Sequence, residues 1–140
     1  MPRVTLASVL LLPVLAAGCG ESILDQLTQP TPVTVIVTDT FTGTLSRNGA
    51  TSHPFPVTST GGGDVTAVLK GIAPDGEAVV GFSLGTWNGT ACQAVISNDR
   101  ATVSASLLGR ATSTGTLCVR VFDIGALSDA QDYEIEVTHP

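Results

Sequence analysis

Residues 115–123 read Gly115-Thr116-Leu117-Cys118-Val119-Arg120-Val121-Phe122-Asp123, and they carry the clearest strand pattern in the chain. A glycine turn leads into a run in which β-branched and aromatic residues alternate with other side chains. This pattern is typical of a β-strand in a half-buried sheet. The sequence therefore predicts that residues 115–123 form a strand with one buried face.

Segments of the same kind recur along the chain. Turn residues separate them about every ten positions, and residues 98–100 and 109–114 are expected to be such connections. Eight or nine short strands spaced in this way predict an all-β domain, a single antiparallel β-sandwich of jelly-roll-like type. Besides 115–123, the expected strands are residues 33–38, 40–46, 53–58, 64–70, 79–85, 92–96, 101–108 and 133–138.

Alternation within these strands predicts which side chains form the core. Pro54 and Pro56 lack backbone N–H donors, so we expect residues 53–58 at the edge of a sheet. Glu134 and Glu136 fall on the outward side of the last strand. The predicted inward set is Phe41, Gly43, Leu45, Phe55, Val57, Val65, Ala67, Leu69, Tyr133, Ile135 and Val137.

The N-terminal residues 1–18 are predicted to be an export signal. Arg3 supplies a short positive region, an apolar run covers residues 4–17, and the run is too short to span a bilayer comfortably. Leu15-Ala16-Ala17-Gly18-Cys19 resembles the bacterial lipobox. That resemblance implies that Cys19 is acylated and becomes the mature N-terminus, and it favours the outer membrane where two membranes exist. An ordinary cleaved signal with a chance cysteine is the alternative.

Residues 19–32 are predicted to be a tether. Residues 22–27 could form one or two helical turns, but Gln29-Pro30-Thr31-Pro32 prevents the helix from continuing and favours an extended spacer. The expected organisation is therefore a lipoprotein signal at 1–18, a lipidated tether at 19–32 and a β-sandwich domain at 33–140.

Charge argues against two classes of partner. The chain carries a net charge of −6, with only 13% charged residues. Phosphate backbones require clustered Lys and Arg, so we expect no nucleic-acid partner. Acidic surfaces also gain nothing from anionic lipid headgroups.

The two remaining cysteines are expected to pair. If Cys19 is lipidated and the chain is exported, Cys92 and Cys118 are most simply a disulfide, and two buried free thiols are the alternative. The only histidines, His53 and His139, do not sit at ligand spacing from a cysteine. We therefore expect neither a metal site nor a cofactor.

Several segments together resemble the bacterial pre-peptidase C-terminal domain. These are Phe41-Thr42-Gly43-Thr44-Leu45, Phe55-Pro56-Val57, the glycines 61–63 before residues 65–69, residues 114–121, and Tyr133-Glu134-Ile135-Glu136-Val137. The resemblance spans nearly all of residues 40–138. It implies a β-sandwich and a non-catalytic module. The acidic ligands with which some such domains bind calcium are not matched here.

Three further groups of residues were weighed as sites. Trp87 could stack on a sugar ring or could instead cap the core. Asn88-Gly89-Thr90 matches a glycosylation acceptor, but an Asn-Gly hairpin turn is the simpler interpretation. Asp64, Asp75 and Asp99 begin or lie in predicted turns, where they would serve a calcium site only if they converged.

The function expected from sequence is a non-catalytic cell-envelope lipoprotein that presents a small binding or spacer module. One alternative is assembly with another envelope protein through open sheet edges. Another is an accessory module for glycan or peptide. The sequence does not identify the ligand, the membrane leaflet, calcium binding or the oligomeric state.

Overall fold

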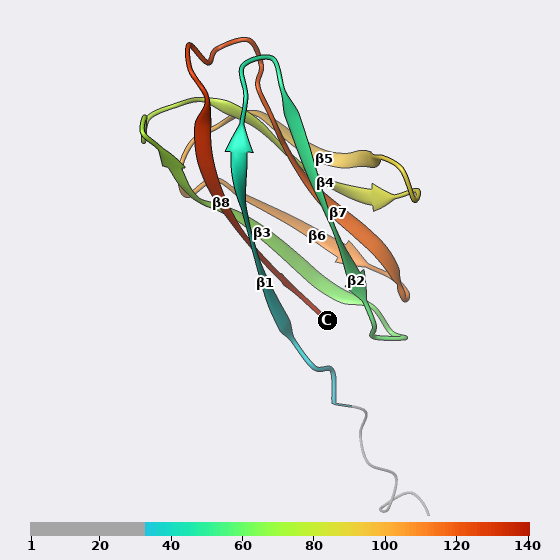
Figure 1. The fold of residues 1–140 in the computed structure, drawn as a ribbon. Coiled ribbons are helices and arrows are strands. Elements are labelled where there is room, and N and C mark those ends of the chain that lie inside the picture. Colours follow the sequence, from blue (N-terminus) through green and yellow to red (C-terminus); the bar gives the residue numbers. More distant parts are fainter. Residues whose placement is uncertain (1–32) are drawn as a thin grey trace, which may run out of the picture. The chain divides into compact units, whose positions relative to one another are not determined.

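The computed structural model describes residues 33–140, and Figure 1 shows their fold. All regular structure in these residues is β-strand. The strands are β1 (Val37–Leu45), β2 (Ala50–Val57), β3 (Gly63–Ala73), β4 (Val80–Trp87), β5 (Cys92–Ala101), β6 (Ser106–Ala111), β7 (Gly115–Phe122) and β8 (Gln131–His139).

The eight strands form two four-stranded antiparallel sheets. The first has the order β1-β8-β3-β6 and the second the order β2-β7-β4-β5. This arrangement is a jelly roll, in which successive strands alternate between the two sheets except for β4 and β5, which are neighbours in the second sheet. The predicted antiparallel β-sandwich is therefore confirmed.

The core lies between the sheets, and it matches the inward residues predicted from alternation. Val65, Ala67 and Leu69 of β3 are fully buried, as are Ile135 and Val137 of β8. The segment at 115–123 supplies β7, which lies between β2 and β4 and buries Val119 and Val121 completely. Phe41 and Gly43 are half-buried rather than fully covered.

β4 is buried on both faces along most of its length. Val80, Phe82 and Leu84 point into the core, while the other face carries Gly81 and Gly85. A side chain at Gly81 would occupy the place of the Phe122 ring, which packs there under the guanidinium of Arg120. Glycine at these positions therefore lets neighbouring groups close over the strand.

The predicted strand at 33–38 is largely wrong. β1 begins only at Val37, because its partner β8 ends at His139 and the pairing stops at Val37 opposite His139. Val33, Val35 and Ile36 lie beyond the last paired residue and are highly exposed.

The expected turn at 98–100 is also wrong. β5 continues through these residues to Ala101, and its register against β4 shifts between Val80 and Phe82. The carbonyl oxygen of the Asn98 side chain accepts a hydrogen bond from the backbone N–H of Arg100 at 3.0 Å. The turn-forming residues thus produce a bulge within a strand instead of ending it.

The expected strand at 101–108 is displaced. Ser104 has a positive φ of 73°, and the N–H of Ala105 donates to the carbonyl of Thr102 at 3.0 Å, which makes a tight turn. β6 begins after this turn at Ser106 and runs to Ala111, through part of the segment expected to be a connection.

The predicted signal at 1–18, the tether at 19–32 and the acylation site Cys19 lie outside the described residues, so they stay predictions. Among residues 33–140, no helix has the length and apolar character needed to cross a membrane.

Candidate functional site

The four edge strands differ in how well they resist pairing with another chain. β2 is an edge strand, as predicted, and Pro54 and Pro56 remove two of its backbone donors. β5 is interrupted by two register shifts, the second of which leaves Val95 as an extra residue. Prolines and bulges both hinder strand addition.

β1 is protected in a different way. Asp39 lies on the same side of β1 as Phe41 and Leu45, so a charged group points inward from this edge. Its Oδ2 lies 3.1 Å from Nε2 of His139, which is 2% exposed. An inward charge on an edge strand is a further device against unwanted pairing.

β6 carries none of these devices. Its six residues pair with β3 without a register shift, and they contain no proline and no inward charge. Leu107 and Ala111 are buried, while Leu108 points outward and is 69% exposed. β6 is therefore the one edge strand of the described sandwich without a proline, a bulge or an inward charge, and its protection comes only from its short length and the exposed Arg110.

An apolar cavity of about 190 Å³ opens beside β6, between the edges of the two sheets. We call it the β5/β6 slot. Val65 lines it from the first sheet, and Leu84, Ile96 and Leu117 line it from the second. Val95, at the bulge of β5, also lines the slot and is 74% exposed.

Gly109 keeps this slot open. A β-carbon at Gly109 would lie 3.0 Å from Cδ2 of Leu84 and 3.4 Å from Cδ1 of Ile96. A larger side chain would therefore fill the slot. The sequence does not reveal this site directly, because Gly109 begins the segment that is predicted to be a polar connection. The alternation of Leu107, Gly109 and Ala111 was the available signal.

A larger hollow of about 470 Å³ lies along β1, β8 and β3. Thr42, Thr44, Asp132 and Glu134 line it, and Thr44 donates a hydrogen bond to Asp132 at 2.6 Å. Water can form hydrogen bonds with the hydroxyl and carboxylate groups that line this hollow. The walls of the β5/β6 slot are mostly apolar, and Ile96 and Leu117 are only half-buried there, which makes the slot the stronger candidate.

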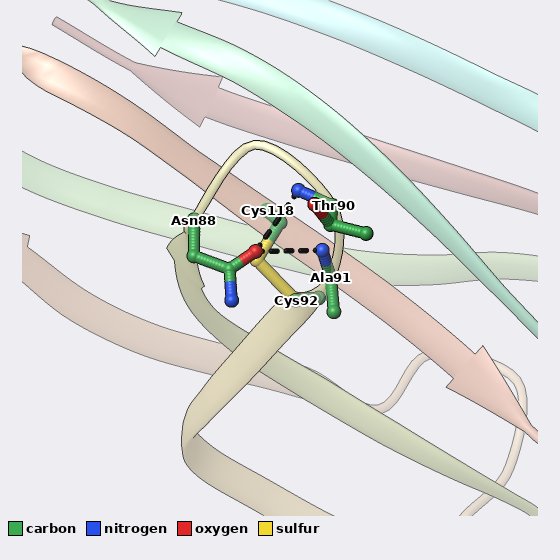
Figure 2. Close-up of a disulfide and its surroundings, with 5 residues drawn as sticks. All are labelled: Asn88, Thr90, Ala91, Cys92 and Cys118. Atoms are coloured by element: carbon green, nitrogen blue, oxygen red, sulfur yellow. Dashed lines mark hydrogen bonds between the residues drawn. A yellow bond between two sulfur atoms is a disulfide. The ribbon is translucent and has the colours of Figure 1, made fainter.

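The predicted pair Cys92–Cys118 is a disulfide, and Figure 2 shows it beneath the β4–β5 turn. β5 and β7 flank β4, so a flat sheet would place them two spacings apart, about 9.6 Å. The two cysteine Cα atoms are only 5.7 Å apart. The start of β5 therefore curls over β4. Gly85 permits this because it has no β-carbon, and a β-carbon at this position would strike the backbone at Gln93.

The Asn88-Gly89-Thr90 segment is a hairpin turn, which agrees with the simpler interpretation. The side-chain oxygen of Asn88 accepts hydrogen bonds from the N–H groups of Thr90 at 2.9 Å and Ala91 at 2.8 Å (Figure 2). Gly89 supplies the positive φ of 95°. Trp87 ends β4 opposite Cys92, is half-buried and lines neither the slot nor the larger hollow.

Both histidines lie between the sheets on the β1/β2 side, a grouping that sequence analysis missed. Nε2 of His53 is 2.7 Å from the hydroxyl of Tyr133, and the His53 ring stacks on Phe41 with centroids 4.8 Å apart. His139 packs against Phe55 with centroids 4.9 Å apart. These aromatic contacts close one side of the sandwich, whereas the slot leaves the opposite side open.

Burial lowers the pKa of His53 and raises the pKa of the Tyr133 phenol, the latter against an opposing hydrogen bond from Thr51. The pair is therefore neutral near pH 7. The side-chain hydrogen-bond partners of the two imidazole rings are Tyr133 and Asp39, and Nδ1 of His139 also contacts the Pro140 carbonyl. None of these partners is a serine or cysteine nucleophile.

The aspartates considered for calcium are engaged locally. Asp64 bonds Arg110 at 2.8 Å, Asp75 accepts the N–H of Glu77 at 3.0 Å, and Asp99 accepts the Ser97 hydroxyl at 2.8 Å. Within residues 33–140, no group of three or more His, Cys, Asp or Glu side chains is placed to hold a metal ion.

Comparison with known proteins gives fold relatives only. The sequence matches no protein-family model and no curated protein. The fold is similar to the Yersinia pseudotuberculosis-derived mitogen, with a TM-score of 0.55, 19% identity and coverage of 74% of this chain and 86% of that one. It is also similar to Aeromonas hydrophila PliG, a periplasmic lysozyme inhibitor of g-type lysozyme, with a TM-score of 0.52, 14% identity and the same two coverages. The chain thus shares its sandwich fold with small bacterial proteins.

Proposed function

We propose that this chain is a non-catalytic, lipid-anchored extracytoplasmic protein whose sandwich binds an extended segment of a protein partner along β6. One observation carries the proposal. The edge strand without a proline, a bulge or an inward charge borders an apolar slot, and an exposed hydrophobic side chain lies on either side of it, Val95 and Leu108.

Strand addition would use both features of this edge. The backbone of an added segment would pair with the free edge of β6, and every second side chain would enter the β5/β6 slot. The remaining side chains would lie beside Leu108 on the outer face. A partner segment with apolar residues at alternate positions therefore fits the edge best.

The extracytoplasmic location is supported by the disulfide, because such bonds persist in oxidising compartments. Acylation at Cys19 and the tether at 19–32 would hold the domain off a bacterial membrane, with the outer membrane favoured where two exist. Substitution Cys19→Ala should abolish membrane attachment and acyl-chain labelling. Unchanged labelling would remove the lipid anchor from the proposal.

A binding role also agrees with two resemblances. The segments that resemble the pre-peptidase C-terminal domain imply a non-catalytic module. PliG, which shares the fold, is described as an inhibitor of lysozyme, and such inhibition requires recognition of another protein. Partner recognition by this chain is proposed on the strength of the β6 edge itself.

Site-specific photo-cross-linking tests the β6 edge. A photoreactive amino acid at Leu108 in the full-length chain should give one discrete protein adduct in the native cell envelope. The same probe at Thr42, which is exposed on the opposite edge of the sheet, is the matched control. Adding Gly109→Val, which fills the slot, should remove the Leu108 adduct. No Leu108 adduct, or equal adducts at both positions, would refute the proposal.

A further inference from the structure

Exposed hydrophobic side chains gather in two places on the described residues. Val33, Val35, Ile36 and Val37 form one group at the start of the described chain, and Val95 and Leu108 flank the β5/β6 slot. Ile124 is the remaining exposed large hydrophobic residue. Six of these seven side chains therefore lie either at the start of the described chain or beside the β5/β6 slot. This suggests that these two apolar surfaces cover each other.

We define residues 33–36 as the N-terminal arm. It continues from β1 past the end of β8, and Figure 1 shows it leaving the body of the sandwich. Val33 and Val35 would share one side of an extended arm, and Thr34 and Ile36 the other. Val33 and Val35 are 86% and 69% exposed. β-Branched residues in this pattern favour a strand once a partner strand is present.

The arm and the slot have matching chemistry. The slot is lined mostly by aliphatic side chains, together with Thr86 and Arg110. Gly109 leaves it open, so it can take the branched side chains of Val33 and Val35. On the outer face, Ile36 would then lie near Leu108, whose side chain is 69% exposed. Each apolar group of one element meets an apolar group of the other.

The arm does not reach the slot of its own chain. β1 and β6 are the two outer strands of a four-stranded sheet, so they lie three spacings apart, about 14 Å. Val35 is two residues from the first paired residue, Val37, which allows a reach of about 7 Å. An arm that places both Val33 and Val35 in a slot must therefore come from another copy.

We propose that the N-terminal arm of one copy adds to β6 of a second copy, with Val33 and Val35 in the β5/β6 slot. This inference rests on the proposed function, because it names the segment that β6 receives. The donor and acceptor surfaces differ, so the contact is heterologous and can repeat from copy to copy as an open chain. Lipid anchors would concentrate the copies on one surface, so a short contact can suffice.

The test places a photoreactive amino acid at Val35 of the full-length chain in membranes of an exporting bacterial host. Irradiation should produce covalent dimers and a ladder of higher species, with the adduct mapping by mass spectrometry to β5 or β6. The same probe at Thr42 should leave the chain monomeric. Aspartate substitutions of Val33 and Ile36, outside the folded core, should abolish the ladder and leave the Tm of the dilute monomer unchanged.

The possible outcomes distinguish a failure of the arm contact from a failure of the proposed function. Monomers or lipid adducts at Val35, together with a different protein cross-linked at Leu108, would overturn the arm and leave β6 as a binding edge. A ladder whose adducts join arm to arm would also overturn it. The absence of adducts at both positions would overturn the arm and the proposed function together.

Discussion

Removal of the Cys92–Cys118 disulfide is expected to destabilise the sandwich strongly. The bond links residues separated by 26 positions and holds the start of β5 against β7 across β4. In the loop-entropy treatment, closing a loop of about 27 residues lowers the entropy of the unfolded chain by about 12 cal/mol/K. The disulfide therefore contributes about 3.5 kcal/mol to the free energy of unfolding at 25 °C.

This free energy converts to a large change in Tm. Unfolding entropy is about 2.1 cal/mol/K per residue, so a domain the size of Val33–Pro140 loses about 4 °C per kcal/mol. The double variant Cys92→Ser/Cys118→Ser should therefore melt about 15 °C below the wild type. The double change avoids leaving one reactive thiol.

Calorimetry of the exported, purified chain with the disulfide intact gives the reference Tm. Thiol titration of the unfolded wild type confirms that the bond is present, because it should detect neither cysteine. A Tm loss below about 4 °C would contradict this prediction, since the double variant would then be held in the same conformation without the bond.

Three other substitutions test separate parts of the structure. Gly85→Ala should lower the free energy of unfolding by at least about 1–3 kcal/mol in urea denaturation, because the new β-carbon would strike the β5 backbone. Gly61 has open space around it, so Gly61→Ala should change the free energy of unfolding by no more than about 0.5 kcal/mol. Burial lowers the pKa of His53 below its unfolded value of about 6.5, so its contribution is complete above pH 6.5 and is lost as pH falls toward the folded pKa. His53→Gln should therefore lose less stability than the wild type between pH 7.5 and pH 5, and equal losses would contradict this. Asp123 accepts the N–H groups of Asn48 at 2.7 Å and Gly125 at 2.8 Å, so Asp123→Ala should lower the free energy of unfolding by about 1–2 kcal/mol. The difference in stability between the wild type and Asp123→Ala should persist near neutral pH and disappear only at acid pH. The reason is that hydrogen bonds, chiefly from the backbone of Asn48, lower the pKa of the Asp123 carboxyl.

The sequence predicted the parts of the fold that depend on local pattern. Alternation identified the inward faces of β2, β3 and β8, and the proline pair marked β2 as an edge. The predicted export signal and the two cysteines that remain besides Cys19 together predicted the disulfide. These features depend on side-chain periodicity and covalent chemistry, which neighbouring residues reveal.

The errors arose where tertiary pairing overrode local signals. Asn98 would favour a turn alone, but β4 continues beside it, and the strand absorbs the extra residues as a bulge. Val33 has strand propensity, but the end of β8 leaves it without a neighbour to pair with. The slot at Gly109 depends on β6 and β5 meeting at one side of the sandwich, and they belong to different sheets. No local pattern encodes that meeting.

Amide hydrogen exchange reports whether another segment is hydrogen-bonded to the outer edge of β6. Full-length wild type on its membrane is compared with the Val33→Asp/Ile36→Asp variant and with the probe-free Gly109→Val variant. We expect the β6 amides that point away from β3 to be protected in the wild type and to exchange rapidly in both variants, while exchange of the β3 amides stays unchanged. Rapid exchange of those β6 amides in the membrane-bound wild type would contradict strand addition at this edge.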